Sequence, residues 1–272
     1  MLPLLTFWEY NKIERIYFEE FSMSIVIHTI IAVLNDFETA DQVLEKALAL
    51  TSQQKAKLEI HYIHEESFVT LHDFFRSAKQ SEEDTVDDAK IKKEIGQRLK
   101  NLGSDGDFPI FVSSDDTAKN ISLLTKDKTD FLVLMAYHEK IAEKVINRIH
   151  TPLLLIKGEK KTYEKALLPI DFREYSIDCV DLAKKLFPQS DIRLYCDYAD
   201  EKEPFEAFRR ETGLEGYFSS DALTTDEDLV AFIKRQDMDL AVLCSWDQDL
   251  LTLNSLTFDF VEETPTDIFF TL

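Results

Sequence analysis

Glycine is scarce in this sequence, with six residues among 272, and the common motifs built on glycine are missing. There is no Gly-x-Gly-x-x-Gly, no Gly-Lys followed by Ser or Thr, and no Gly-x-Ser-x-Gly. These motifs serve dinucleotide binding, phosphate binding and the exposed nucleophile of α/β-hydrolases. The sequence therefore lacks the standard signatures of all three classes.

Cysteine is also rare. The three cysteines, Cys179, Cys196 and Cys244, are far apart and form no Cys-x-x-Cys pair. All three lie in apolar segments. We therefore expect small core residues in a reducing compartment rather than disulfides or metal ligands.

Long apolar runs are absent too. The N-terminal segment 1–10 has no cationic leader, and charged residues return at Glu9, Lys12 and Glu14. It is too short and too charged for a signal peptide or a membrane span, so we expect a soluble, cytoplasmic protein.

Positive charge is the last deficit, with 31 Lys and Arg against 52 Asp and Glu and a net charge of -21. Such a chain repels phosphate backbones and anionic lipid, which argues against nucleic-acid and membrane partners. Hydrophobic residues make up 44% of the chain, enough for a folded globular protein with one large or two ordinary cores.

The predicted strands and helices alternate, and their order occurs twice. The first pass has expected strands at 25–34, 58–63, 108–112, 130–135 and 152–156, with helices at 40–54, within 67–102 and at 116–126. The second pass has expected strands at 166–170, 192–198, 216–219, 238–244 and 264–270, with helices at 176–187, 204–212 and 226–236. Two five-stranded units explain this order more economically than one ten-stranded sheet.

The expected strands are apolar throughout, which is typical of parallel sheets covered on both faces. The predicted fold class is α/β, with two tandem Rossmann-like domains, each an open five-stranded parallel sheet with helices on both faces. The expected division is an extension or misassigned start at 1–22, a first domain at 23–157, a linker at 158–164 and a second domain at 165–272.

The stretch Lys165–Ser176 carries the most specific local pattern. An apolar strand at 166–170 ends in the polar, turn-forming residues 171–175, and Ser176 opens an amphipathic helix. This stretch resembles the first strand and loop of universal stress proteins, which read much like Pro-Ile-Asp-Phe-x-Glu-Tyr-Ser. The likeness in element order covers nearly everything after Met23.

The resemblance implies an adenine nucleotide alpha hydrolase-like fold whose crevice binds ATP in some members. In those members an acidic residue after the first strand lies near adenosine, and a glycine-rich loop after the fourth strand wraps the phosphates. The first repeat departs from this pattern, since Asn35 replaces the aspartate and helix follows Met135 at once. We expect no nucleotide there.

The second repeat keeps Asp171 but offers Asp247 and Asp249 in the loop, whose charge opposes a triphosphate. If ATP binds at all, the resemblance places it in this repeat, at a cofactor site formed by Asp171, Phe172, Ser245, Asn254 and Ser255. Alternatively, Asp171 and Ser176 only shape the turn and cap the helix. Trp246 could stack on a ligand ring or serve packing.

No metal site is expected. His61 and His64 are three apart in a strand and point to opposite faces, while His138 and His150 flank a helix with no carboxylate at ligand spacing. No recognisable nucleophile or base supports an enzyme, so a hydrolase of small phosphorylated metabolites is the weakest option.

The resemblance therefore implies a cytoplasmic stress-response or regulatory protein that acts through protein contacts without ATP. The alternative is a nucleotide sensor that uses the second domain only. Because family members commonly pair through the fifth strand, we expect 153–156 and 266–271 to pair within the chain as a pseudo-dimer, with a further homodimer left open.

Overall fold

The computed structural model describes residues 26–65, 88–128, 130–149, 151–170, 176–196, 202–218, 226–243 and 258–271. Of residues 176–178, 226–228 and 258 only the backbone is described.

The first half alternates strands with helices. Its elements are β1 (Thr29–Leu34), α2 (Ala40–Gln54), β2 (Lys57–Glu65), α4 (Asp88–Asn101), β3 (Ile110–Asp115), α5 (Thr117–Thr125), β4 (Phe131–Ala136), α6 (Glu139–Ile146) and β5 (Leu153–Ile156). The central strands β1, β4 and β5 consist almost entirely of Leu, Ile, Val, Ala, Met and Phe, because helices cover both of their faces.

The second half repeats this order, and most of its elements are shorter. They are β6 (Lys165–Pro169), α7 (Ser176–Leu186), β7 (Asp191–Cys196), α8 (Lys202–Thr212), β8 (Gly216–Phe218), α9 (Asp226–Gln236), β9 (Leu240–Leu243), α10 (Phe258–Glu263) and β10 (Asp267–Phe270). The α/β fold class predicted from the sequence is confirmed.

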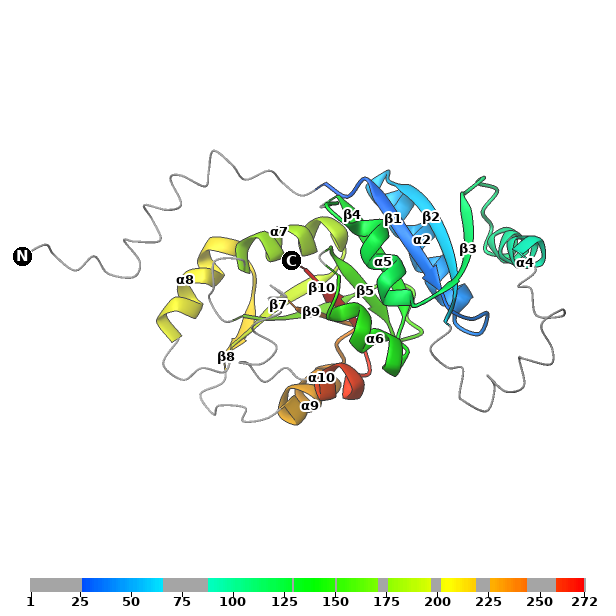
Figure 1. The fold of residues 1–272 in the computed structure, drawn as a ribbon. Helices are drawn as coiled ribbons and strands as arrows, with labels where there is room; N and C mark the ends of the chain where they lie inside the picture. Colours follow the sequence, from blue (N-terminus) through cyan, green and yellow to red (C-terminus); the bar gives the residue numbers. More distant parts are fainter. Residues whose placement is uncertain are drawn as a thin grey trace, which may run out of the picture.

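The strands form one sheet in the order β3-β2-β1-β4-β5-β10-β9-β6-β7-β8. Each half is parallel within itself, and the two meet at β5 and β10, which pair antiparallel with Phe269 opposite Leu154. The sequence favoured two five-stranded units over one ten-stranded sheet; in the structure the two units share one continuous sheet, because their fifth strands β5 and β10 pair. Figure 1 shows α4 beside β3 at one end and α8 beside β8 at the other.

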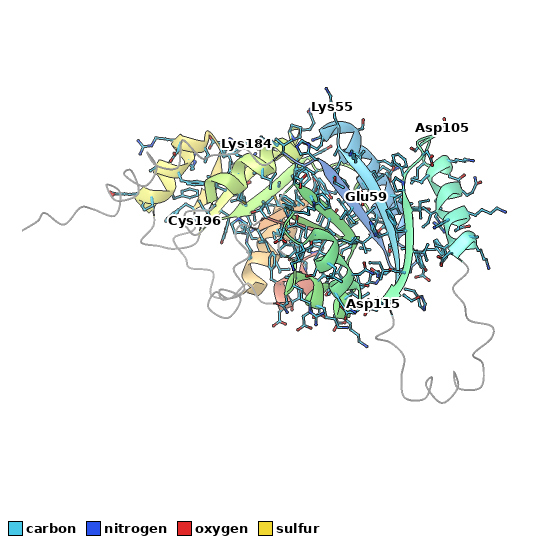
Figure 2. All side chains as sticks on the ribbon, turned by 45° about the horizontal axis from the view of Figure 1, so that its top comes forward. Lys55, Glu59, Asp105, Asp115, Lys184 and Cys196 are labelled. Carbon is cyan, nitrogen blue, oxygen red and sulfur yellow. The ribbon has the colours of Figure 1, made fainter. Side chains whose placement is uncertain are left out.

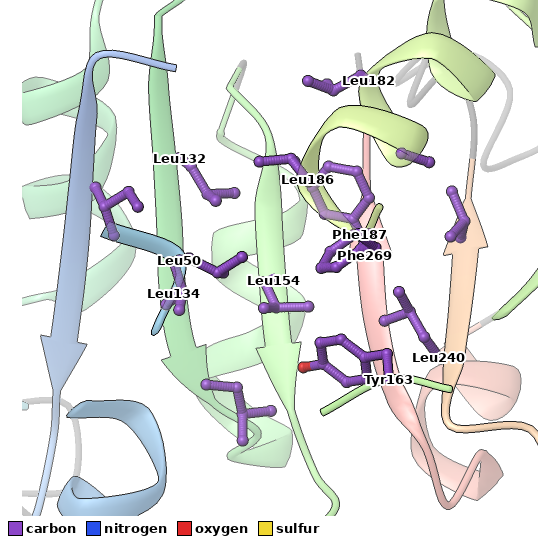
Figure 3. Packing of buried hydrophobic residues seen from close by; sticks show 14 of the residues in the cluster. Leu50, Leu132, Leu134, Leu154, Tyr163, Leu182, Leu186, Phe187, Leu240 and Phe269 are labelled. Carbon is purple, nitrogen blue, oxygen red and sulfur yellow. The ribbon is translucent and has the colours of Figure 1, made fainter. Parts of the chain in front are cut away.

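Hydrophobic packing continues across this junction on both faces of the sheet. One face is covered by α2, α4, α7 and α8, and its cluster joins Leu50 and Leu154 of the first half to Phe269 of the second (Figure 3). The other face is covered by α5, α6, α9 and α10 and joins Leu155 to Ile268. Because each strand alternates its side chains between the faces, one antiparallel pairing fuses both cores.

Several element bounds differ from the sequence-based expectation, and one helix was not expected. Strand β2 extends to Glu65, past the expected end at 63, and β3 runs to Asp115 rather than 112. The six-residue helix α10 was not predicted, because a segment this short shows little periodicity. No helix within the described ranges is both long enough and apolar enough to span a bilayer.

Candidate functional site

The first half has its topological switch point between β1 and β4, which pair side by side at the centre of its strand order. In open parallel sheets the crevice outside the carboxyl ends of these strands is the usual ligand position. Asn35 follows β1 there, and its side-chain amide donates to Ile63 O (3.1 Å) and to Thr117 Oγ1 (2.9 Å). Asn35 thus ties β1 to the end of β2 and to the start of α5, so both amide protons serve the fold.

Asp36 and His138 face each other across the switch point. His138 Nε2 lies 3.1 Å from Asp36 Oδ2, within ion-pair distance but without the alignment of a hydrogen bond. The other carboxylate oxygen of Asp36 accepts from Thr39 N and Oγ1 at 2.8 and 3.0 Å. The sequence did not predict this pair, because the carboxylate comes from the loop after another strand. We inferred from sequence spacing that His138 has no carboxylate partner, and that inference was wrong.

The N-terminus of α5 is already occupied by carboxylates. Asp116 caps the helix by accepting from Lys119 N at 2.8 Å, and the buried Glu65 accepts from Thr117 N at 2.8 Å. Lys144 lies 3.6 Å from Glu65 and 3.5 Å from Asp116. A helix N-terminus attracts anions, but here the side chains of the protein take that position.

The connection from β4 to α6 holds only two residues, Tyr137 and His138, because β4 ends at Ala136 and α6 begins at Glu139. Tyr137 N donates to Ile156 O at 2.8 Å, which fixes the connection against the end of β5. A loop that wraps phosphates needs several free backbone N–H groups. The described connection has no room for one.

The candidate residues of the second half, Asp171, Phe172, Ser245, Asn254 and Ser255, all lie outside the described residues, as do His150 and Trp246. The strands that lead to them are described. β6 pairs with β9 at Ala166 and Leu167 only, whereas β1 pairs with β4 over five residues. The ladder between the switch-point strands is therefore shorter in the second half, where Pro169 of β6 also has no backbone N–H to donate.

Tyr62 at the end of β2 and Phe37 after β1 stack near this edge with ring centroids 5.1 Å apart. Burial and the nearby Asp36 carboxylate raise the pKa of the Tyr62 hydroxyl, so it is protonated at neutral pH. At the neighbouring His61 burial acts in the opposite direction and lowers the pKa of the imidazole, although the hydrogen bond and the charge of Glu59 oppose this shift. Within the described ranges no group of three His, Cys, Asp or Glu side chains could hold a metal ion.

The cysteine prediction needs one correction. Cys179 in α7 is buried and disulfide-bonded, whereas the sequence led us to expect reduced thiols throughout. Cys196 at the end of β7 is a buried thiol, as expected. Isolated cysteines far apart in sequence give no signal of their pairing, which explains the error.

A second polar cluster lies at the junction of the halves. Lys46 of α2 is 5% exposed and places Nζ 2.6 Å from Oδ2 of Asp267 in β10, which is 1% exposed. The Tyr163 hydroxyl donates to the same oxygen at 2.5 Å, while Lys157 N and Gly158 N donate to Oδ1 at 2.8 and 2.7 Å. The Asp267 carboxylate of the second half thus contacts the first half through Lys46 and the linker through Lys157, Gly158 and Tyr163.

The linker is fixed at two further points. Lys160 forms an ion pair with the buried Asp239, whose Oδ2 accepts from Glu164 N at 2.8 Å. Burial by itself raises the pKa of Asp239, but the hydrogen bonds from Lys160 and from the backbone hold it below its ordinary value. The Lys157 ammonium donates to Val261 O and Glu262 O at the end of α10, and burial lowers its pKa to about 8.

A sheet with two switch points and helices on both faces defines the chain as a doubly wound, Rossmann-like α/β protein. No protein-family model matches the chain, and no curated protein matches its sequence. Solved structures do match. A universal stress protein from Archaeoglobus fulgidus superposes with a TM-score of 0.63 at 12% identity, covering 89% of this chain and 95% of that one.

Two proteins from Pseudomonas aeruginosa match similarly. One, described as functionally unknown, has a TM-score of 0.62 at 13% identity and covers 91% of this chain and 93% of its own. The other, a putative universal stress protein, has a TM-score of 0.61 at 12% identity and covers 91% and 94%. At these identities the likeness establishes the fold: the chain has the fold of universal stress proteins over nearly its whole length.

Proposed function

We propose that this chain is a universal stress protein that acts in stress response through contacts with other proteins, without ATP and without catalysis. The family assignment is supported by the full-length match in fold to two structures described as universal stress proteins. A cytoplasmic location is part of the proposal. The Cys179 disulfide, which reducing compartments disfavour, is the observation against it.

The observation that carries the proposal is the filled switch point of the first half. The Asn35 side-chain amide donates its hydrogen bonds to Ile63 O and Thr117 Oγ1, and only two residues separate β4 from α6. An incoming triphosphate would also meet the carboxylates of Asp36 and Glu65. Like charges at short range oppose binding unless a cation intervenes.

The shorter ladder between β6 and β9 favours one alternative, a nucleotide sensor that uses the second half alone. Strands that are not paired up to their carboxyl ends leave backbone groups there that a ligand could contact. Asp171, Phe172, Ser245, Asn254 and Ser255 are the residues proposed to hold ATP in that case.

Thermal unfolding of the full chain with and without millimolar MgATP separates the two functions. A ligand at 100 times its dissociation constant adds about 2.7 kcal/mol to the free energy of unfolding, a shift of roughly 5–10 °C for a protein of this size. We expect no shift. A rise that disappears in Asp171→Ala but persists in Asp36→Asn would overturn the proposal in favour of the sensor.

A further inference from the structure

Strand β3 forms one end of the sheet and, among the described residues, pairs only with β2. Helix α4 stands beside it at the extremity of the molecule, as Figures 1 and 2 show from two directions. An edge strand with unpaired backbone groups is a template for a further strand. This end of the molecule has several features that favour such an addition.

The first feature is the direction of the backbone groups of β3. Ile60 N donates to Pro109 O, and Ile60 lies opposite Ile110 in the parallel register. The alternation of a parallel ladder then directs the N–H and C=O of Phe111 and Ser113 toward β2. Those of Ile110, Val112 and Ser114 point away from the sheet, where an added strand would find them.

The second feature is an aromatic side chain on one face of the edge. Phe111 is 47% exposed and stacks on the buried His61 ring with centroids 4.7 Å apart. A half-exposed phenylalanine on an edge strand offers apolar area to an incoming side chain.

The third feature is the orientation of α4 over the other face. Its buried side chains are Ile95 and Leu99, and Arg98 turns toward α2, where it pairs with Asp41 at 2.7 Å. At 100° per residue, Lys92 and Lys100 fall on the opposite flank, away from α2 and over the free edge. The helix carries five cations against two carboxylates in a chain of net charge -21.

The fourth feature is Gly96, which lies between these lysines on the same flank. A glycine inside a helix costs about 1 kcal/mol relative to alanine. No described atom lies within 4 Å of the position that its Cβ would occupy, so packing within the described chain does not require it. A bare backbone at this point leaves room for a strand to approach beneath the helix.

We propose that the β3 edge binds an extended acidic segment of a partner protein as an added strand. Its acidic residues would face Lys92 and Lys100, and the alternate apolar residues would cover Phe111. This inference rests on the proposed function and names the surface through which the protein contact is made. Two copies of the chain joined edge to edge would bring two basic α4 helices together, which disfavours a second copy as the occupant.

The test is fluorescence anisotropy of the full chain with a labelled octapeptide of alternating Glu and Val at low salt. We expect saturable binding that weakens with added salt, because the contact is partly electrostatic. The charge reversal Lys92→Glu with Lys100→Glu should weaken binding about tenfold or more, since it replaces attraction by repulsion. The matched control, Lys202→Glu with Lys234→Glu, reverses two exposed lysines of the second half and should change nothing.

Ser114→Pro tests the backbone contact separately. It removes an outward N–H while the groups that face β2 stay in place, so the fold is retained and peptide binding is lost. A lysine–valine octapeptide that binds equally well, binding unaffected by either variant, or a concentration-dependent dimer abolished by Ser114→Pro would each overturn the inference. If ATP has no effect and the peptide does not bind, the proposed function stands and only this surface is wrong.

Discussion

Asp267 is the residue on which the contact between the halves converges. Its carboxylate receives the Lys46 ammonium, the Tyr163 hydroxyl and two backbone N–H groups of the linker. Burial of Tyr163, followed by the negative charge of Asp267, raises the pKa of the phenol well above its ordinary value, so it remains a donor. Such a saturated carboxylate tolerates burial only while its partners remain.

We expect Lys46→Met to lower the free energy of unfolding by about 3 kcal/mol, because it leaves the Asp267 charge buried without its cation. Adding Asp267→Asn should recover part of that loss, since the uncompensated charge is then gone. Urea denaturation of the single and double variants measures both values.

The control is Lys161→Met. Lys161 pairs with Glu45 at 2.6 Å on the surface, and its removal should cost no more than about 0.5 kcal/mol. Equal losses for Lys46→Met and Lys161→Met would contradict the role given to the buried pair.

At the scale of the element, two glycines, one inside helix α4 and one just after it, have opposite requirements. Gly96 has an ordinary backbone and open space at its Cβ position, whereas Gly103, just after the helix, has φ +79°. Gly103 N donates to Lys100 O and Ser104 N to Leu99 O, the pattern of a glycine that ends a helix.

Gly96→Ala should therefore raise the free energy of unfolding by up to about 1 kcal/mol, through its gain in helix propensity. Gly103→Ala should lower it by a similar amount, because alanine at positive φ is strained. Chemical denaturation compares the two. If Gly96→Ala also weakens binding of the acidic octapeptide, stability and binding make opposite demands on this position; a destabilised Gly96→Ala would refute the packing argument.

Element types were largely predictable because the central strands are short, continuous apolar runs and the longer helices show an amphipathic period. Helix α2, for example, shows a stripe of Val43, Leu44 and Ala47, and its bounds at 40 and 54 agree with the prediction. The extra residues His64 and Glu65 in β2 could not be predicted from apolarity, because strand ends are polar.

The contacts within the candidate site could be predicted less well from the sequence. The departure of Asn35 from the expected aspartate was visible, but its bonds to Ile63 and Thr117 depend on how three elements converge. The pairing of Asp36 with His138 has the same origin. The period of a sequence pattern predicts which face of a helix or strand a residue lies on. Contacts between the ends of different strands can be predicted only when the order of the strands in the sheet is known.

At the scale of the whole molecule, the two fused clusters make the halves interdependent. Phe187 and Phe269 from the second half pack with ring centroids 5.3 Å apart, in a cluster that also contains Leu154 of the first half. A core that crosses the junction on both faces of the sheet leaves neither half with a complete surface of its own.

Calorimetry of the full chain should therefore show one cooperative unfolding transition rather than two. Phe269→Ala removes a fully buried ring and should lower the midpoint of that single transition, with a cost of about 3–5 kcal/mol. Two resolved transitions, of which only the one for the second half moves, would show that the halves are independent.

The antiparallel pairing of β5 with β10 lies within one chain, so it does not depend on the concentration of the protein. Two separate chains joined at such strands would come apart as their concentration fell, whereas here a short linker, fixed by Asp267 and Asp239, holds the strands at a high effective concentration. The interface survives however little protein a cell makes. Each half is also free to differ from the other without losing its partner, so two unlike switch points, with a five-residue ladder in one half and a two-residue ladder in the other, can coexist in every molecule.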